Sequence, residues 1–94
     1  MLNLIILNCD DGRKLYFSNG QRTARGFHEN VQDGTLYPQR ESASQDFAML
    51  RSTIEGQAIV RNALIRPGWK QVDGHLTMEQ YGQGEAIATA NVRL

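Results

Sequence analysis

The fold is set first by residues 2–18, which read LNLIILNCDDGRKLYFS. Two strand-like segments, 2–8 and 13–18, flank an Asp-Gly dipeptide, which is the strongest short-range signal for a β-hairpin. Gly12 of this dipeptide can take the left-handed conformation that closes the loop. The segment 2–8 is apolar on both of its faces, and such a strand is normally covered on both sides. We therefore expect it near the middle of an antiparallel sheet.

Two more Asp-Gly dipeptides, at 33–34 and 73–74, predict two more hairpins. The first would pair residues 27–31 with residues 35–37. The second would pair residues 69–72 with residues 75–78, so that alternate side chains share a face. On the core face of this hairpin we expect Trp69, Leu76 and Met78. On its polar face we expect Lys70, Val72, His75 and Thr77.

The segment 85–94 alternates strictly and predicts a half-buried strand after a tight turn at Gly82-Gln83-Gly84. One face would carry Ala86, Ala88, Ala90, Val92 and Leu94. Ile87 would lie on the outer face with the polar residues. A terminal strand of this kind lies at a sheet edge, where unpaired backbone groups invite pairing with another chain. We therefore expect a homodimer through the 85–94 strand.

A helix is predicted over about residues 43–55. Ser42 and Gln45 have the spacing of a capping box, in which each side chain bonds the backbone amide of the other residue. The apolar stripe of this helix consists of Phe47, Leu50 and Ile54. Gly56 follows the stripe and predicts the end of the helix.

Residues 57–65 fit two patterns. Ile59, Val60, Ala63 and Leu64 form a helical stripe, whereas the β-branched content and the flanking glycine and proline favour a strand, which is our interpretation.

A chain of 94 residues is long enough for one domain and too short for two. We predict a single α+β domain over 1–94, in which one amphipathic helix packs on an antiparallel sheet built from hairpins.

The composition excludes several classes of protein. Cys9 is the single cysteine and cannot form an internal disulfide, so a secreted disulfide-bonded scaffold is excluded. The apolar run 2–7 is too short for a membrane span and has no positive segment before it. We expect a cytoplasmic protein that does not engage a membrane.

No motif predicts a catalytic, cofactor or metal site. Cys9, Asp10 and Asp11 are adjacent, and successive strand residues point to opposite faces, so they do not converge on one ion. His28 and His75 belong to no recognisable nucleophile motif, although a meeting of Cys9 and His28 in space stays open. The Gly82-Gln83-Gly84 turn is followed by no lysine, unlike a phosphate-binding loop. We therefore predict a protein that is not an enzyme and binds no cofactor and no metal.

The segment 19–41 is the least regular part of the chain. It contributes little predicted core, and long irregular segments in small domains usually serve a function. We expect a small protein-binding module that acts by occupying a partner protein. By analogy of size, this describes an inhibitor or accessory protein of the phage, plasmid or immunity type. The predicted partner-binding residues are Arg22, Arg25, Phe27, Tyr37 and Arg40.

In this prediction the arginines make charge contacts and the aromatic residues are anchors, since Arg and Tyr are over-represented among the residues that dominate binding energy. A second interpretation stays open. Phe27 and Tyr37 would then fill one end of the core, while the arginines would be solvated.

A nucleic-acid-binding domain is the alternative function. Aromatic and cationic side chains interleaved on strands can stack on bases and neutralise phosphates. The first forty residues carry the cations Arg13, Lys14, Arg22, Arg25 and Arg40. They also carry the aromatic residues Tyr16, Phe17, Phe27 and Tyr37. Four acidic residues in the same region nearly cancel the positive charge, so a strong field for phosphate binding is absent. A protein partner is therefore the first expectation.

Overall fold

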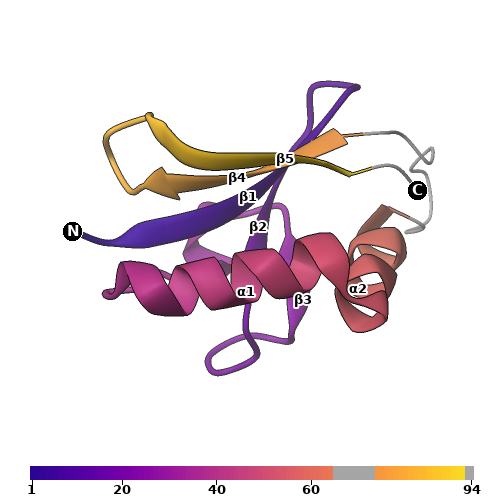
Figure 1. Cartoon of the computed structure of the whole chain (residues 1–94), viewed down its shortest axis with the longest axis horizontal. Helices are drawn as coiled ribbons and strands as arrows, with labels where there is room; N and C mark the ends of the chain where they lie inside the picture. Colours follow the sequence, from indigo (N-terminus) through magenta and orange to yellow (C-terminus); the bar gives the residue numbers. More distant parts are fainter. Residues whose placement is uncertain (65–73, 93–94) are drawn as a thin grey trace.

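The computed structural model describes residues 1–64 and 74–92 of the chain. In this part of the chain, five strands form one antiparallel sheet in the order β3-β2-β1-β4-β5, and two helices lie against one of its faces (Figure 1). The predicted α+β class is confirmed. The elements are β1 (Asn3–Cys9), β2 (Lys14–Ser18), β3 (Gly26–His28), the 3-10 turn η1 (Val31–Asp33), α1 (Arg40–Ser52), α2 (Ile54–Leu64), β4 (Gly74–Gln80) and β5 (Ala86–Val92).

β1 lies at the centre of the sheet, as predicted, with β2 on one side and β4 on the other. Gly12 has a φ of 93°, and its N–H donates to the carbonyl of Cys9 over 2.9 Å, which closes the first hairpin. Alternate side chains of β1 are buried on both faces. Ile5 and Leu7 belong to the core under the helices, whereas Leu4 is buried on the opposite face.

The Asp-Gly dipeptide at 33–34 does not form a hairpin, so this prediction is wrong. Residues 26–28 instead pair with β2, and Val31–Asp33 form η1. The backbone of 35–37 bonds to two other strands. The N–H of Thr35 donates to Phe17 of β2, and the N–H of Tyr37 donates to Asn3 of β1, each over 2.8 Å. These bonds to distant strands take the place of the predicted local pairing.

β4 has both of its edges occupied. Residues 75–78 pair with β1 on one side and with β5 on the other, so the predicted hairpin of these residues with 69–72 is wrong. Residues 69–72, and with them Trp69, Lys70 and Val72, lie outside the described residues. The predicted faces of the other half are confirmed. Leu76 and Met78 are buried in the core, and His75 and Thr77 alternate with them on the opposite face.

α1 begins at Arg40, three residues before the predicted start. Gln39 precedes it and makes no side-chain capping bond, so the predicted capping box of Ser42 and Gln45 is not the helix start. The apolar stripe is confirmed for Phe47 and Leu50, which are buried. It is wrong for Ile54, which is 89% exposed and belongs to the next helix.

Thr53 separates the two helices. Its backbone is extended (φ −98°, ψ 153°), and its hydroxyl donates to the Met49 carbonyl over 2.6 Å and accepts from the Gly56 N–H over 3.0 Å. One side chain thus closes the end of α1 and caps the start of α2. Gly56, the predicted helix end, lies inside α2. A Cβ at this position would overlap the backbone of Met49 and Leu50, so glycine permits α2 to pack against the end of α1.

Residues 57–64 are helical, so the strand interpretation of this segment is wrong and the helical stripe is the informative signal. Val60 and Ala63 are buried one turn apart, and Ile59 is partly buried beside them. The segment is helical because its apolar stripe packs against α1 and β3, and this packing stabilises the helix. The sequence of the segment alone does not show that these two elements lie beside it. The structure therefore has two helices in the described residues where the sequence predicted one.

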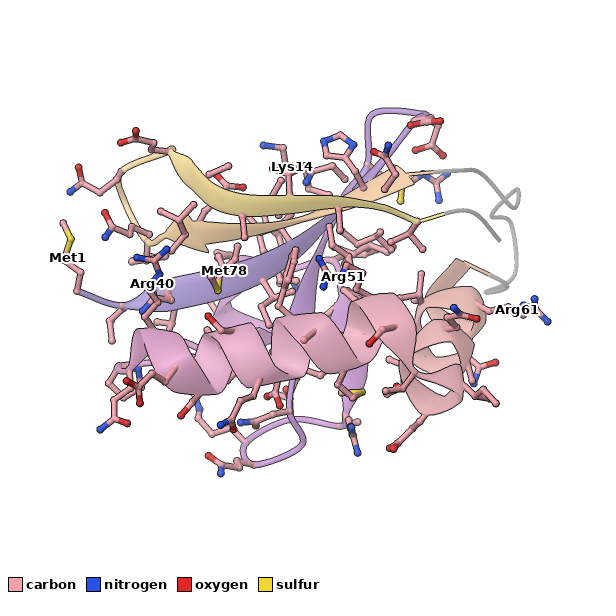
Figure 2. All side chains as sticks on the ribbon, in the orientation of Figure 1. Met1, Lys14, Arg40, Arg51, Arg61 and Met78 are labelled. Carbon is pink, nitrogen blue, oxygen red and sulfur yellow. The ribbon has the colours of Figure 1, made fainter. Side chains whose placement is uncertain are left out.

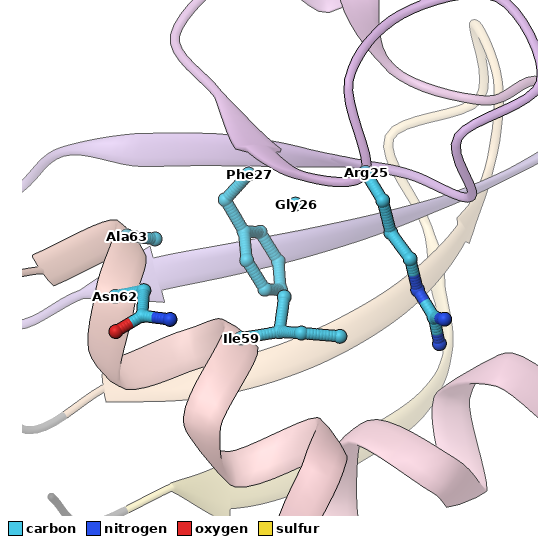
Figure 3. Close-up of a pocket in the computed structure, with 6 residues that line it drawn as sticks. All are labelled: Arg25, Gly26, Phe27, Ile59, Asn62 and Ala63. Carbon is cyan, nitrogen blue, oxygen red and sulfur yellow. The ribbon is translucent and has the colours of Figure 1, made fainter.

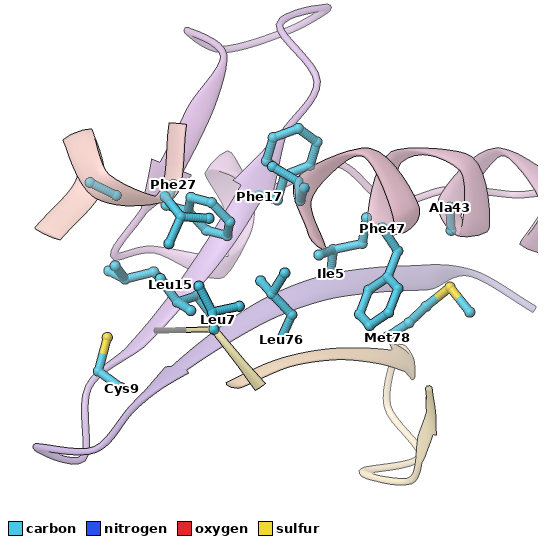
Figure 4. Close-up of a cluster of buried hydrophobic side chains, with 14 of the residues drawn as sticks. Ile5, Leu7, Cys9, Leu15, Phe17, Phe27, Ala43, Phe47, Leu76 and Met78 are labelled. Atoms are coloured by element: carbon cyan, nitrogen blue, oxygen red, sulfur yellow. The ribbon is translucent and has the colours of Figure 1, made fainter. Parts of the chain in front are cut away.

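The core lies between the helices and the sheet (Figure 4). The rings of Phe17 and Phe27 pack at a centroid distance of 5.5 Å on neighbouring strands. Neither helix of the described segments has the length and apolar character needed to cross a membrane.

β5 contains a bulge that changes its predicted faces. The register shifts between Met78 and Glu79, so that Ala88 faces Met78 whereas Ala86 faces Glu79. Ile87 is the extra residue and packs partly buried against the core, so its predicted place on the outer face is wrong. The predicted core face is confirmed for Ala88, Ala90 and Val92 and is wrong for Ala86, which is exposed.

Candidate functional site

The two predicted aromatic anchors are core residues. Phe27 is 1% exposed and Tyr37 is 3% exposed, so neither presents an exposed ring to a partner. Their burial agrees with the second interpretation, in which both rings fill the core, and their role as partner-binding anchors stays a prediction. The reason is non-local: Phe27 packs on Phe17 in the sheet, and Tyr37 is held by Asn3 of β1.

Tyr37 also has a polar contact with α1. Its hydroxyl donates to the Asp46 carboxylate over 2.6 Å. Burial, followed by this hydrogen bond, raises the pKa of the Tyr37 hydroxyl above its ordinary value of 10.0. The side chain therefore stays protonated and serves to connect the sheet with α1.

The three predicted arginines are exposed and lie in separate places. Arg22 lines a small cavity of about 110 Å³ between the β2–β3 loop and residues 33–36. Arg40 lies at the start of α1, at one end of the helical layer, whereas Arg61 is at the other end (Figure 2). Arg25 lies beside α2. The predicted set does not converge on one surface, and only Arg25 and Phe27 line the same pocket.

This pocket, which we call the α2 pocket, lies between the edge strand β3 and α2 (Figure 3). It has a volume of about 140 Å³ and is lined by Arg25, Gly26, Phe27, Ile59, Asn62 and Ala63. Phe27 and Ala63 are almost fully buried in its inner wall, so the half-buried Ile59 is the most accessible apolar side chain there, and polar atoms form more than half of the exposed lining. Arg25 and Asn62 are exposed and form a polar rim. The pocket is therefore small, and its exposed lining mixes polar and apolar surface.

Arg25 is oriented by contacts from both helices. Its Nη1 lies 2.8 Å from Oε1 of Glu55 in α2, and its Nη2 lies 3.7 Å from the sulfur of Met49 in α1. Both members of the ion pair are largely exposed, so the pair contributes little to stability. A guanidinium has five N–H donors, and these two contacts leave donors for a further acceptor. A cation is thus held at the mouth of the α2 pocket.

The outer face of α2 adds a second apolar feature. Ile54 is 89% exposed, the largest exposed fraction among the large apolar side chains of the described residues. It lines a cavity of about 240 Å³ with Gln57, Ala58, Arg61 and Asn62. Asn62 borders both cavities, so the two lie side by side along α2.

The sequence prediction missed Ile59, Asn62 and Ala63, because it treated their segment as a strand. The signal that points to them is the helical stripe of residues 59, 60, 63 and 64. Ile54 was assigned to the core stripe of the preceding helix. A threonine immediately before it, with its capping preference, indicates that a new helix begins there.

The open question of a Cys9 and His28 pair is answered by the sheet. Cys9 belongs to the core on the helical face. His28 alternates with Phe27 and lies on the opposite face, with its Nε2 2.6 Å from the Ala24 carbonyl. The two side chains therefore do not form a nucleophile and base. Burial, and then the charge of Asp11, raise the pKa of the Cys9 thiol, which keeps it in the unreactive form.

The stacking argument for nucleic-acid binding loses most of its residues. Phe17, Phe27 and Tyr37 are buried, and Tyr16 is half-buried. Two of the cations have acidic neighbours: Arg13 lies 3.6 Å from Asp11, and Arg25 lies 2.8 Å from Glu55.

Comparison with protein-family models, with curated proteins and with solved structures finds no match for this chain. The candidate function therefore rests on the geometry of the chain itself.

Proposed function

We propose that the protein is a small, non-enzymatic protein-binding module that receives an apolar side chain of a partner protein in the α2 pocket. The observation that carries this proposal is the pocket in which Ile59 lies beside the buried Phe27 and Ala63, beneath a rim that holds Arg25. Interfaces combine a desolvated apolar centre with a polar rim, and arginine is enriched among their strongest contacts. Ile54 supplies exposed apolar surface on the same helix.

The partner segment that suits this pocket has an apolar side chain next to a carboxylate, which would meet the open donors of Arg25. Occupation of a partner is the mode of action of an inhibitor or accessory protein, and we include the phage, plasmid or immunity type in the proposal. A cytoplasmic setting fits a buried thiol that has no disulfide partner among the described residues.

The test is affinity capture from a lysate of the source cells, treated with nuclease, with three baits. Asn62→Trp places a large ring at the exposed rim and closes the pocket, so we expect at least a tenfold loss of the captured protein. Gln45→Trp is the matched control, because Gln45 is an exposed helical residue on α1, away from the pocket. It should capture as much protein as the unmodified chain.

Equal capture by all three baits would show that the partner binds elsewhere. Nuclease-sensitive recovery of nucleic acid, with no protein lost in Asn62→Trp, would favour the nucleic-acid alternative. Melting curves of both variants exclude loss of folding as the cause.

A further inference from the structure

The two edges of the sheet differ in their protection. β3 at one edge has only three residues, and α2 packs beside it. β5 at the other edge has seven residues, AIATANV, with no charged residue and no proline. Charges, prolines, short length and covering elements are the usual means by which proteins prevent edge-to-edge pairing. β5 has a bulge at its start and none of the other means in the described structure.

The hydrogen-bond pattern shows which residues of β5 face outward. Cys9 of β1 bonds toward β2, and Leu2 accepts from Tyr81 beyond β4, so the even-numbered residues of β1 bond to β4. Bonding directions alternate along each antiparallel strand.

The pairs Leu76 with Ala90 and Met78 with Ala88 are therefore the bonded pairs between β4 and β5. It follows that Thr89 and Asn91 direct their N–H and C=O groups away from the sheet.

We propose that β5 pairs antiparallel with β5 of a second copy of this chain, about a twofold axis at Ala90. The regular part of the strand, 88–92, is then paired along its whole length. Thr89 exchanges two backbone hydrogen bonds with Asn91 of the second copy, and the twofold axis repeats this exchange. The two five-stranded sheets become one continuous sheet with the helices on one face.

A second copy is the occupant that the side chains favour. On the helical face, Ala90 meets its own symmetry mate and Ala88 meets Val92, so small residues allow close approach and extend the apolar layer. On the opposite face, the exposed Thr89 and Asn91 side chains lie opposite each other and are both polar. The strand carries no charge, and the chain has a net charge of zero, so two copies do not repel each other. This inference is independent of the α2 pocket, which lies at the β3 edge.

The first experiment measures the mass in solution by light scattering at high micromolar concentration. The unmodified chain should give twice its mass of 10.6 kDa. Thr89→Lys combined with Asn91→Lys places like charges opposite each other, and the measured mass should fall to that of one chain. Thr89→Glu combined with Asn91→Glu should do the same. An equimolar mixture of the two variants should restore the double mass, because lysines then face glutamates.

The matched control combines Gln45→Lys with Ser52→Lys, two exposed positions on α1, and should remain dimeric. Both side chains changed in β5 are exposed and point away from the core, so the fold should be retained, as circular dichroism would verify. A single-chain mass for the unmodified protein overturns the proposal. A double mass for the two-lysine variant of β5, or no recovery in the mixture, overturns it as well.

A second experiment tests the register without added charge. Ala90 and its symmetry mate form a non-hydrogen-bonded pair, with Cα atoms about 4.5 Å apart, a separation that a disulfide can span. Ala90→Cys should therefore form a covalent dimer on mild oxidation. Ala88→Cys faces Val92 of the other copy and should not, nor should the unmodified chain with its buried Cys9. Absence of the covalent dimer in Ala90→Cys contradicts this pairing.

Discussion

The hydroxyl of Tyr37 donates a 2.6 Å hydrogen bond to the carboxylate of Asp46 in α1. The backbone of the same tyrosine exchanges two hydrogen bonds of 2.8 Å with Asn3 of β1. One residue therefore joins the segment that precedes α1 to both layers of the fold. The irregular region 19–41 is held to the core at this point.

Replacing Tyr37 with phenylalanine removes the hydroxyl and leaves the half-buried Asp46 carboxylate without this donor. We expect the free energy of unfolding to fall by about 1.5–3 kcal/mol, as for hydrogen bonds to charged groups. Urea denaturation measures it. Tyr81→Phe is the control, because Tyr81 is 50% exposed, and its change should stay within about 0.5 kcal/mol. Equal effects of the two substitutions would contradict the role of the Tyr37 hydroxyl.

The raised pKa of Tyr37 makes stability depend on alkaline pH. The folded state favours the protonated hydroxyl, so the stabilisation is fully present below the unfolded value of 10.0 and is lost as the pH rises toward the folded value. Between pH 10 and pH 11 the unfolding free energy should fall by up to about 1.4 kcal/mol through this group. Denaturation of the parent chain and of Tyr37→Phe over this range measures the difference. If both chains lose stability equally with pH, Tyr37 is not the cause.

The break between α1 and α2 predicts that Leu50 and Ile54 differ in their contribution to stability, although the sequence placed both on one apolar stripe. Leu50→Ala removes a fully buried side chain and should cost about 2–5 kcal/mol. Ile54→Ala changes an exposed side chain and should stay within about 0.5 kcal/mol. Thermal melting distinguishes the two. A large loss in Ile54→Ala would indicate a single continuous helix with Ile54 in the core.

Gly56→Ala tests the contact between the helices. In an unhindered helix this change stabilises by about 1 kcal/mol, because glycine is a poor helix former. Here the added methyl group would overlap the backbone of Met49 and Leu50, so the free energy of unfolding should fall instead. Gln57→Ala, at the adjacent exposed position, should be nearly neutral. A stabilised Gly56→Ala variant would show that α2 stands away from the end of α1.

We expect charge reversal at Arg25 and at Arg22 to affect partner binding differently, although the sequence analysis predicted both as partner contacts. Arg25→Glu reverses the charge at the rim of the α2 pocket, and we expect at least a tenfold loss of captured partner. Arg22→Glu makes the same change at a different cavity and should leave capture unchanged. Melting temperatures should shift by only a few degrees in both, because both side chains are exposed. A loss confined to Arg22→Glu would move the site to the β2–β3 loop.

The sequence by itself determined the features that depend on neighbouring residues. The hairpin around Gly12, the central place of the apolar β1, and the buried stripe of Phe47 and Leu50 follow from turn chemistry and periodicity. The edge position of β5 was also predicted, because the segment is terminal and half-buried. These signals are local, and the structure satisfies them within a few residues.

Only the tertiary structure decided the features that depend on distant contacts. Phe27 is buried because β3 pairs with β2, and Tyr37 is buried because it bridges to Asn3. Residues 57–64 are helical because α1 and β3 bury one face of the segment. The α2 pocket exists only where that helix meets β3, so its residues come from two segments that no local pattern connects. Burial of apolar surface against distant elements outweighs local preference at these positions, since most helical stability comes from such packing.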